Sequence, residues 1–168
     1  MKAVYLCGFM GCGKSTIGQR LSKKMGFAFL DTDKEIVRQT GKEIVEIFSE
    51  NTEQGFRELE HSLMQQWSVL QNKVIATGGG TFLNPENVVL AKKNGLIVFL
   101  EAPFSICYER IYREQTRPIA NRSSKETLKQ LFAQRQSIYE QAANLIINAN
   151  QSVELCAQEI KMLLSPFL

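Results

Sequence analysis

Residues 8–18 read Gly8-Phe9-Met10-Gly11-Cys12-Gly13-Lys14-Ser15-Thr16-Ile17-Gly18. The first glycine and the segment Gly13-Lys14-Ser15 complete the pattern G-x-x-x-x-G-K-S/T of a phosphate-binding loop, or P-loop. The apolar run at 3–7 predicts a buried strand before the loop, and residues 15–25 have the spacing of an amphipathic helix. This order of elements favours a nucleoside triphosphate site over an ordinary glycine-rich turn.

The residue types of the loop suit a bound triphosphate. Glycines let backbone N–H groups point at the β-phosphate, and the helix N-terminus adds a partial positive charge. Lys14 would bring its ammonium to the β- and γ-phosphates, and Ser15 would offer a hydroxyl to Mg²⁺. Met10 and Cys12 are expected to contribute only backbone groups.

Length and composition narrow the class of protein. A chain of 168 residues that is 44 % hydrophobic and 22 % charged fits one globular domain. The net charge of +3, without a run of five basic residues, argues against a nucleic-acid partner. The four cysteines lack C-x-x-C spacing, so we expect neither disulfides nor a zinc site, and predict a reducing cytoplasm. The N-terminal apolar run is too short for a signal peptide or a membrane span.

Apolar runs that resemble strands alternate with helical patterns along the chain. This alternation predicts an α/β fold of parallel strands with crossover helices. The strand-like runs are residues 4–7, 27–30, 74–76, 96–100 and 145–147. In such open sheets, ligands bind beyond the carboxyl ends of the strands.

Several residues mark the expected helices. Gly26 is a stop signal for the first helix, and Ser152 is a start signal for the last one. The segment Ser123-Ser124-Lys125-Glu126 is a candidate capping box. One further helix carries an apolar stripe made of Phe56, Leu59, Leu63, Trp67 and Leu70.

Two strand ends carry candidate site residues. Asp31 and Asp33 follow the second run, and a strand period of two places both carboxylates on the P-loop side. Asp33 has the alternative role of a helix cap. The third run ends in Thr77-Gly78-Gly79-Gly80 without an acid, so Asp31 is the candidate for the metal. The three glycines allow a ligand to approach the backbone closely, although a loose turn is the alternative.

Arginines are the candidates for binding a second anion. Arg135 lies within the apolar stripe of its helix, where a guanidinium needs an anionic partner. The alternatives are a buried ion pair within the protein, or a side chain that reaches the rim. Arg57 lies three residues before Glu60 and four before His61, either of which can hold it, although a solvated helix face is the alternative.

A second basic group precedes Pro118. Arg110, Arg113 and Arg117 recur at nearly helical spacing, which indicates either a basic lid or an exposed charged helix end. His61, the only histidine, is interpreted as a helix-surface residue or a partner of Glu60 rather than as a catalyst.

Six segments together carry a family resemblance. They are Gly8 to Thr16, Asp31-Thr32-Asp33, Phe56-Arg57-x-x-Glu60, Thr77-Gly78-Gly79-Gly80, Arg117-Pro118 and Arg135-x-x-x-Tyr139. In this order, over nearly the whole chain, the sequence resembles shikimate kinase. The P-loop is shared by many families, whereas the Asp-Thr-Asp, Phe-Arg-x-x-Glu and triple-glycine segments are far more specific. Cys12 departs from the family's usual Ser or Ala, and the lid segment has its own sequence.

The resemblance implies a fold and a reaction. The fold is a three-layer P-loop sandwich like that of the nucleoside monophosphate kinases, with a five-stranded parallel sheet of order 2-3-1-4-5. Residues 1–168 would form one kinase domain, with an acid-binding helical segment at about 34–62 and a lid at about 111–124. The implied reaction is Mg²⁺- and ATP-dependent phosphorylation of the 3-hydroxyl of shikimate, in the chorismate and aromatic amino-acid pathway. We expect a cytoplasmic monomer without nucleic-acid or membrane partners.

The resemblance also implies roles by position. The nucleotide contacts would be Gly11, Cys12, Gly13, Lys14, Ser15, Thr16, Arg110 and Arg117. Arg110 would contact adenine, and Arg117 would close over the site from the lid. The metal would be held by Ser15 and, through water, by Asp31. The substrate contacts would be Asp33 at the hydroxyls, Gly79 and Gly80 along the ring, and Arg57 and Arg135 at the carboxylate. Catalysis would depend on Lys14, Asp33 and Arg117. Asp33 is the candidate to take the proton from the acceptor hydroxyl.

Two other classes compete with this interpretation. A kinase resembling gluconate kinase is the nearest enzyme alternative, and the Asp-Thr-Asp segment with Arg57 argues against it. A guanine nucleotide switch would carry an N-K-x-D motif, and Asn72-Lys73-Val74-Ile75 lacks the final acid. A nucleic-acid kinase would require an extended basic groove.

Overall fold

The computed structural model describes residues 2–114 and 123–167, which form a five-stranded parallel sheet. Its strands are β1 (Ala3–Cys7), β2 (Ala28–Asp31), β3 (Lys73–Ala76), β4 (Gly95–Glu101) and β5 (Leu145–Asn148). They are arranged in the order β2-β3-β1-β4-β5, with Val4 of β1 opposite Val74 of β3 and Leu96 of β4. The predicted fold class and strand order are therefore confirmed.

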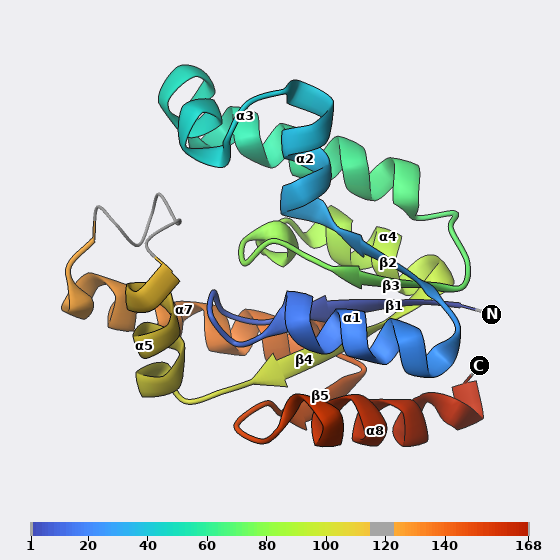
Figure 1. The fold of residues 1–168 in the computed structure, drawn as a ribbon. Helices are drawn as coiled ribbons and strands as arrows, with labels where there is room; N and C mark the ends of the chain where they lie inside the picture. Colours follow the sequence, from blue (N-terminus) through green and yellow to red (C-terminus); the bar gives the residue numbers. More distant parts are fainter. Residues whose placement is uncertain (1, 115–122, 168) are drawn as a thin grey trace.

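Helices connect the strands and cover both faces of the sheet. They are α1 (Lys14–Met25), α2 (Thr32–Thr40), α3 (Ile44–Trp67), α4 (Pro85–Asn94), α5 (Phe104–Glu114), α7 (Lys125–Ala142) and α8 (Val153–Leu164), with short 3₁₀ turns η1 (Thr81–Leu83) and η2 (Ser165–Phe167). Helices α1 and α8 pack together on one face, whereas α4 and α7 contact β4 from the other (Figure 1). Helices α2 and α3 pack together beyond the β2 edge. This three-layer arrangement leaves the carboxyl ends of the strands facing the P-loop.

Strand β1 is the centre of the core. All five of its residues are buried, because helices cover the sheet on both sides. Tyr5 is 0 % exposed, and its hydroxyl donates to the carbonyl oxygen of Trp67 at 3.3 Å. Burial raises the pKa of Tyr5 to about 12, so the phenol stays neutral and keeps this bond. The core thus fixes β1, and with it the start of the P-loop.

The helix signals are confirmed at some positions and wrong at others. Gly26 ends α1 with φ of 67°, and the Ser152 hydroxyl accepts from the Leu155 N–H at the start of α8. The N-cap of α7 is Ser124 rather than Ser123, since its hydroxyl accepts from Thr127 N–H. Leu70 was assigned to the stripe of α3, but it lies beyond the end of that helix.

Helix α3 contains a break that its periodicity did not predict. Thr52 has φ of 62° and ψ of 169°, which lie outside the helical region and divide α3 into two parts. A positive φ is unusual for a β-branched residue. The break separates the start of α3 from the second part, which carries Arg57 and Glu60.

The cysteines, the search for membrane spans and the lid bear on the predicted compartment and domain layout. None of the helices in the described part of the chain is long and apolar enough to span a membrane. All four cysteines are buried and unpaired. Burial raises the pKa of the Cys7 thiol, and raises that of Cys107 to about 12. Residues 115–122 of the expected lid, with Arg117, lie outside the described residues.

Candidate active site

The P-loop closes between β1 and α1 and needs glycine at two points. Gly11 has φ of 79°, and a Cβ there would come within 2.6 Å of the Cys107 carbonyl oxygen. Gly13 is the N-cap of α1 with φ of 102°, and it supplies no side chain to cap the first N–H groups. The first turn of α1 also contains no acidic residue. The open helix N-terminus is therefore available to an anion.

Lys14 is held back onto the loop that precedes it. Its side chain is buried, with the residue 7 % exposed, and Nζ donates to the carbonyl oxygens of Gly8 at 2.8 Å and Phe9 at 3.0 Å. Cys12 Sγ lies 3.7 Å from the same nitrogen. The ammonium therefore satisfies its hydrogen-bonding capacity inside the P-loop.

Ser15 and Asp31 form the pair of oxygen ligands expected for a metal. The Ser15 hydroxyl donates to Asp31 Oδ2 at 2.6 Å. Asp31 is the N-cap of α2 as well, since its Oδ1 accepts from Lys34 N–H at 3.3 Å. No cluster of three or more His, Cys, Asp or Glu side chains occurs among residues 2–114 and 123–167. The pair fits a hard cation such as Mg²⁺, which keeps water and phosphate oxygens as its remaining ligands.

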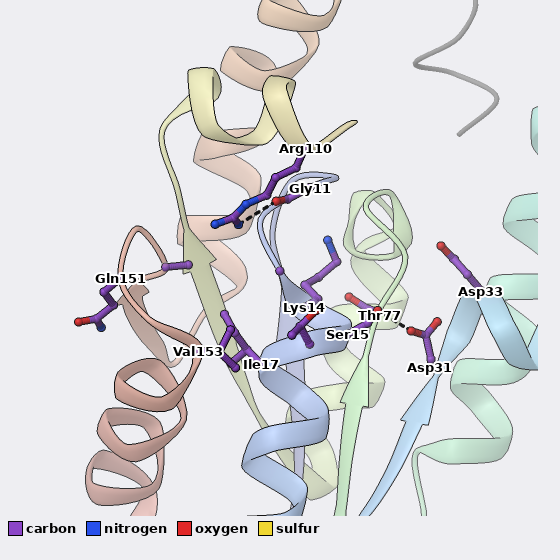
Figure 2. Close-up of a pocket in the computed structure, with 13 residues that line it drawn as sticks. Gly11, Lys14, Ser15, Ile17, Asp31, Asp33, Thr77, Arg110, Gln151 and Val153 are labelled. Carbon is purple, nitrogen blue, oxygen red and sulfur yellow. Dashed lines mark hydrogen bonds between the residues drawn. The ribbon is translucent and has the colours of Figure 1, made fainter. Parts of the chain in front are cut away.

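A cavity of about 390 Å³ lies over the P-loop and the carboxyl ends of β2 and β3. Figure 2 shows Asp31 and Asp33 on one side of the loop and Arg110, from α5, reaching over the other side. The cavity is lined by Gly11, Gly13, Lys14, Ser15, Thr16, Ile17, Asp31, Asp33, Thr77, Arg110, Ala149, Gln151 and Val153. Ala149, Gln151 and Val153, around the start of α8, were missed because no motif marks them.

Asp33 reaches the cavity by a different route from the one predicted. Strand β2 ends at Asp31 and α2 begins at Thr32, so Asp33 lies in the first helical turn. The argument from the strand period was therefore wrong, although both carboxylates line the same cavity. The cap of α2 is Asp31, which excludes the alternative role of Asp33 as the N-cap.

Arg110 is tied to the P-loop, whereas Arg113 is not. Arg110 Nη1 donates to the Gly11 carbonyl oxygen at 3.1 Å, which holds α5 against the loop. Arg113 is exposed and pairs with Glu109 at 2.5 Å, so it follows the exposed-helix interpretation. The contact of Arg110 with a base stays a prediction.

The triple glycine brings the other predicted residues together. Gly78 N–H donates to the buried hydroxyl of Thr32 at 2.7 Å, which ties the glycine loop to the start of α2. A Cβ on Gly78 would overlap Glu60 and lie 2.9 Å from Asp33 Oδ1. A Cβ on Gly80 would overlap the guanidinium of Arg57. The loop is therefore packed between side chains from α2 and α3.

Arg57 is oriented by two carboxylates of its own helix. Nη1 lies 2.5 Å from Glu60 Oε2, and Nη2 lies 3.0 Å from Glu53 Oε1. Burial lowers the pKa of Arg57, but the attraction and hydrogen bonds of Glu60 and Glu53 outweigh it and leave the pKa raised. Glu60 is itself buried and accepts from the Thr81 hydroxyl at 2.6 Å. Glu60 was predicted as a holder of Arg57, whereas Glu53 and Thr81 were not.

Arg135 is a buried cation for which the described part of the chain offers no acidic partner. The residue is 4 % exposed, and Nη1 makes a long contact of 3.4 Å to the Gly79 carbonyl oxygen. Its Nε is buried and has no hydrogen-bond partner, and no ion pair to Arg135 occurs in the described parts of the chain. The alternatives of an internal ion pair and of a side chain at the rim are therefore wrong. The guanidinium is available to an external anion.

His61 lies apart from this group. Its Nδ1 is 2.7 Å from Asn87 Oδ1, and its Nε2 is 3.0 Å from Gln65 Nε2 and 3.4 Å from Glu86 Oε2. Its partners are therefore not Glu60, whose bonds go to Arg57 and Thr81. No observation gives His61 a chemical role.

The sheet order, the P-loop and the cavity at the strand ends define a kinase of the P-loop class. Solved structures of a gluconokinase from Sinorhizobium meliloti (TM-score 0.64, 14 % identity) and a deoxyadenosine kinase from M. mycoides (TM-score 0.63, 15 % identity) share this fold. The family model of shikimate kinase matches residues 10–164. The chain belongs to the shikimate kinase family.

Individual relatives agree over nearly the full length. A shikimate kinase from Persephonella marina is 39 % identical over 160 residues, which cover 95 % of this chain and 97 % of the relative. Another from Sulfurihydrogenibium is 40 % identical and covers 90 % of both chains. Among solved structures, shikimate kinase from Acinetobacter baumannii in complex with shikimate has a TM-score of 0.93 and 34 % identity, covering 100 % of this chain and 96 % of that one.

Proposed function

We propose that this chain transfers the γ-phosphoryl group of ATP to the 3-hydroxyl of shikimate, giving shikimate 3-phosphate and ADP in chorismate and aromatic amino-acid biosynthesis. Membership of the shikimate kinase family supports the reaction, and the A. baumannii relative was solved with shikimate bound. The observation that carries the assignment of residues is the glycine loop, around which Asp33, Arg57 and Arg135 gather next to the P-loop.

The phosphate side would bind ATP through the P-loop. Backbone N–H groups at the start of α1 would face the phosphates, and Lys14 would leave the carbonyls of Gly8 and Phe9 to contact them. Ser15 and Asp31 fit Mg²⁺, which when bound neutralises phosphate charge. Arg110 and Arg117 would contact the nucleotide, as the resemblance implies. The site would thus neutralise and orient the triphosphate.

The acid side would bind shikimate through its carboxylate and hydroxyls. Arg57, which Glu60 and Glu53 orient, and Arg135, which has no internal acid, would bind the carboxylate from two helices. Gly79 and Gly80 would line the ring, as the resemblance implies, and a side chain at Gly80 would overlap Arg57. Asp33 would bind the acceptor hydroxyl and take its proton.

The chemistry depends mainly on positioning. Phosphoryl transfer needs the acceptor oxygen in line with the γ-phosphate and the charge of that group neutralised. Gly79 is the point at which the two sides meet, because a Cβ there would lie 3.7 Å from both Arg135 Nη1 and Met10 N. An acid anchored by the arginines would therefore present its hydroxyls toward the P-loop.

Replacement of Arg135 tests the assignment. We expect Arg135→Ala to raise the KM for shikimate about 10- to 150-fold, or about 1.5–3 kcal/mol, from the loss of charge-assisted bonds. The KM for ATP should stay the same. Arg113→Ala, which removes an exposed arginine outside the cavity, is the matched control. An unchanged KM for shikimate in Arg135→Ala would remove Arg135 from the site.

The acceptor itself is tested by ADP release. A coupled assay across shikimate, quinate and gluconate should show turnover with shikimate well above the other two. Equal ADP release with and without an acceptor would favour a nucleotide switch, and preference for gluconate would favour the rival kinase.

The oligomeric state and the compartment are separate predictions. Size-exclusion chromatography tests the predicted monomer, and the cytoplasm remains the predicted compartment.

A further inference from the structure

Tyr139 shares an acceptor with Arg135. It lies one helical turn after Arg135 on α7, is 1 % exposed and packs against Phe99 with ring centroids 5.4 Å apart. Its hydroxyl donates to the Gly79 carbonyl oxygen at 2.5 Å, whereas Arg135 Nη1 reaches the same oxygen only at 3.4 Å. Burial raises the pKa of Tyr139, so the phenol keeps its proton and acts as a donor. The phenol is thus the principal partner of this carbonyl.

Without that hydroxyl, the carbonyl would turn to Arg135. The Gly79 carbonyl is partly buried, so the nearest remaining donor is expected to replace the phenol as its partner. Among residues 2–114 and 123–167, only Tyr139 and Arg135 donate to the Gly79 oxygen. The guanidinium is within reach, because Arg135 interacts with the Tyr139 side chain and its Nη1 lies 3.4 Å from the Gly79 oxygen, while Nε has no partner among the described residues. A shortened bond to Gly79 would pull it away from any external anion.

We propose that the hydroxyl of Tyr139 is a positioning group for the acid substrate: by binding the Gly79 carbonyl, it leaves the Arg135 guanidinium available to the substrate's carboxylate. This inference rests on the proposed function, which assigns Arg135 to that carboxylate. Tyr139 acts through Arg135 and Gly79 and does not itself touch the substrate.

The same bond fixes a peptide group that faces both sides of the site. The Gly79 carbonyl and the Gly80 N–H belong to one planar peptide, so holding the oxygen also sets the direction of the N–H. Glycines on both sides of a peptide give it unusual freedom to rotate. A Cβ on Gly79 would contact Met10 N of the P-loop at 3.7 Å, and one on Gly80 would overlap Arg57. Rotation of this peptide would therefore disturb the contacts to the arginines and to the phosphate side.

Tyr139→Phe removes the hydroxyl and keeps the ring. We expect the KM for shikimate to rise about 3- to 10-fold, as for the loss of one hydrogen bond, with kcat changed less than about twofold. The KM for ATP should stay the same, since the P-loop contacts are intact. A variant with unchanged KM for shikimate, or one in which kcat alone falls, would overturn the inference.

Tyr5→Phe is a matched control within the same chain. Tyr5 is also a buried tyrosine whose hydroxyl donates to a backbone carbonyl, but that carbonyl belongs to Trp67 rather than to the glycine loop. Both variants should lose some thermal stability, because each removes a hydrogen bond from a tyrosine hydroxyl to a backbone carbonyl. Only Tyr139→Phe should change the KM for shikimate. An equal rise in KM in both variants would indicate a general structural effect and overturn the inference.

A double-mutant cycle separates this inference from the proposed function. Once Arg135→Ala has removed the guanidinium, Tyr139→Phe should raise the KM for shikimate no further. Additive effects would overturn the inference and leave the acid-binding role of Arg135 intact. If Arg135→Ala by itself has no effect on KM, the proposed acid site and this inference fail together.

Discussion

Lys14 and Arg135 are both buried cations at one site, and they differ in what holds them. Lys14 binds two carbonyl oxygens of its own loop, at 2.8 and 3.0 Å. Arg135 has a long contact of 3.4 Å to a carbonyl oxygen, an interaction with the Tyr139 side chain, and a buried Nε with no partner among the residues that the structure describes. The phosphate side therefore satisfies its cation internally, whereas the acid side keeps binding capacity for a ligand. Binding of the acid should accordingly depend more on one side chain than binding of the nucleotide does.

The largest effect is expected at Asp33, the carboxylate proposed to take the proton of the acceptor hydroxyl. Asp33→Asn should preserve folding but lower kcat about 10²- to 10⁴-fold, because an amide cannot take the proton of the acceptor hydroxyl. Steady-state kinetics and a thermal melt provide the measurement. The control is Glu35→Gln, a carboxylate in the same helical turn that binds Arg38. Near-normal turnover in Asp33→Asn would refute the catalytic role and reduce the acid side to binding alone.

The second-largest effect is expected at Lys14, the buried cation of the phosphate side. Lys14→Met should lower kcat about 10²- to 10³-fold, through loss of charge stabilisation at the transferred group. Thermal stability should fall somewhat, since the buried carbonyl oxygens of Gly8 and Phe9 lose the donor that Lys14 supplies. Lys23→Met, on the exposed face of α1, supplies the comparison. Retained turnover would show that the internal bonds of Lys14 are its only role.

A smaller effect is expected from a methyl group on the acid side. In Gly80→Ala the new Cβ overlaps the guanidinium of Arg57, which must move away from Glu60. The KM for shikimate should rise about tenfold, since a displaced donor loses a charge-assisted bond. Calorimetric titration with ADP serves as the internal control and should give an unchanged Kd. Weakened ADP binding together with the change in KM would show that the two sides are not independent.

The smallest effect concerns acid stability at the ion pairs between α1 and α8. Arg20 and Lys24 bind Glu154, and these hydrogen bonds lower the pKa of Glu154 to about 2. A carboxyl group with a lowered folded-state pKa stabilises the protein above its unfolded pKa, near 4.5, and that stability is lost as pH falls toward 2. Because the group is exposed, Glu154→Gln should lower Tm only slightly at pH 6.

Thermal melts from pH 6 down to pH 2 provide the measurement. The gap in Tm between Glu154→Gln and the unaltered chain should close as the pH falls, because a protonated glutamate resembles glutamine. A gap that persists at pH 2 would mean that packing, rather than charge, links α1 to α8.

The sheet and the phosphate side were predictable because local sequence determines them. The strands lie within one residue of their apolar runs at both ends. In the three inner strands, β1, β3 and β4, burial on both faces requires such continuous apolar stretches. Lys14, Ser15 and Asp31 lie where motif and strand end placed them. The phosphate side is built from backbone groups and from residues close together in the sequence, so motif spacing was sufficient to locate its residues.

The residues around the glycine loop were named from the sequence, and their binding roles stay predictions, whereas the contacts that support them were not predicted. Contacts such as Thr81 to Glu60 and Gly78 to Thr32 join segments 21 and 46 residues apart, which no periodicity reveals. Tyr139 was part of a motif, yet its bond to Gly79 spans 60 residues and was not predicted. Asp33 was wrongly placed by the alternation of side chains along a strand. Asp31 caps α2, which begins at the next residue, so Asp33 belongs to a helix rather than to a strand.

The reactivity of the buried cysteine thiols would report unfolding of this enzyme. Burial raises the pKa of Cys7, Cys107 and Cys156, so these thiols remain in the poorly nucleophilic protonated form at neutral pH. A colourimetric thiol reagent should therefore react slowly with the native protein and rapidly once denaturant opens the core. The time course would measure how often the chain opens around the nucleotide site, without any added label.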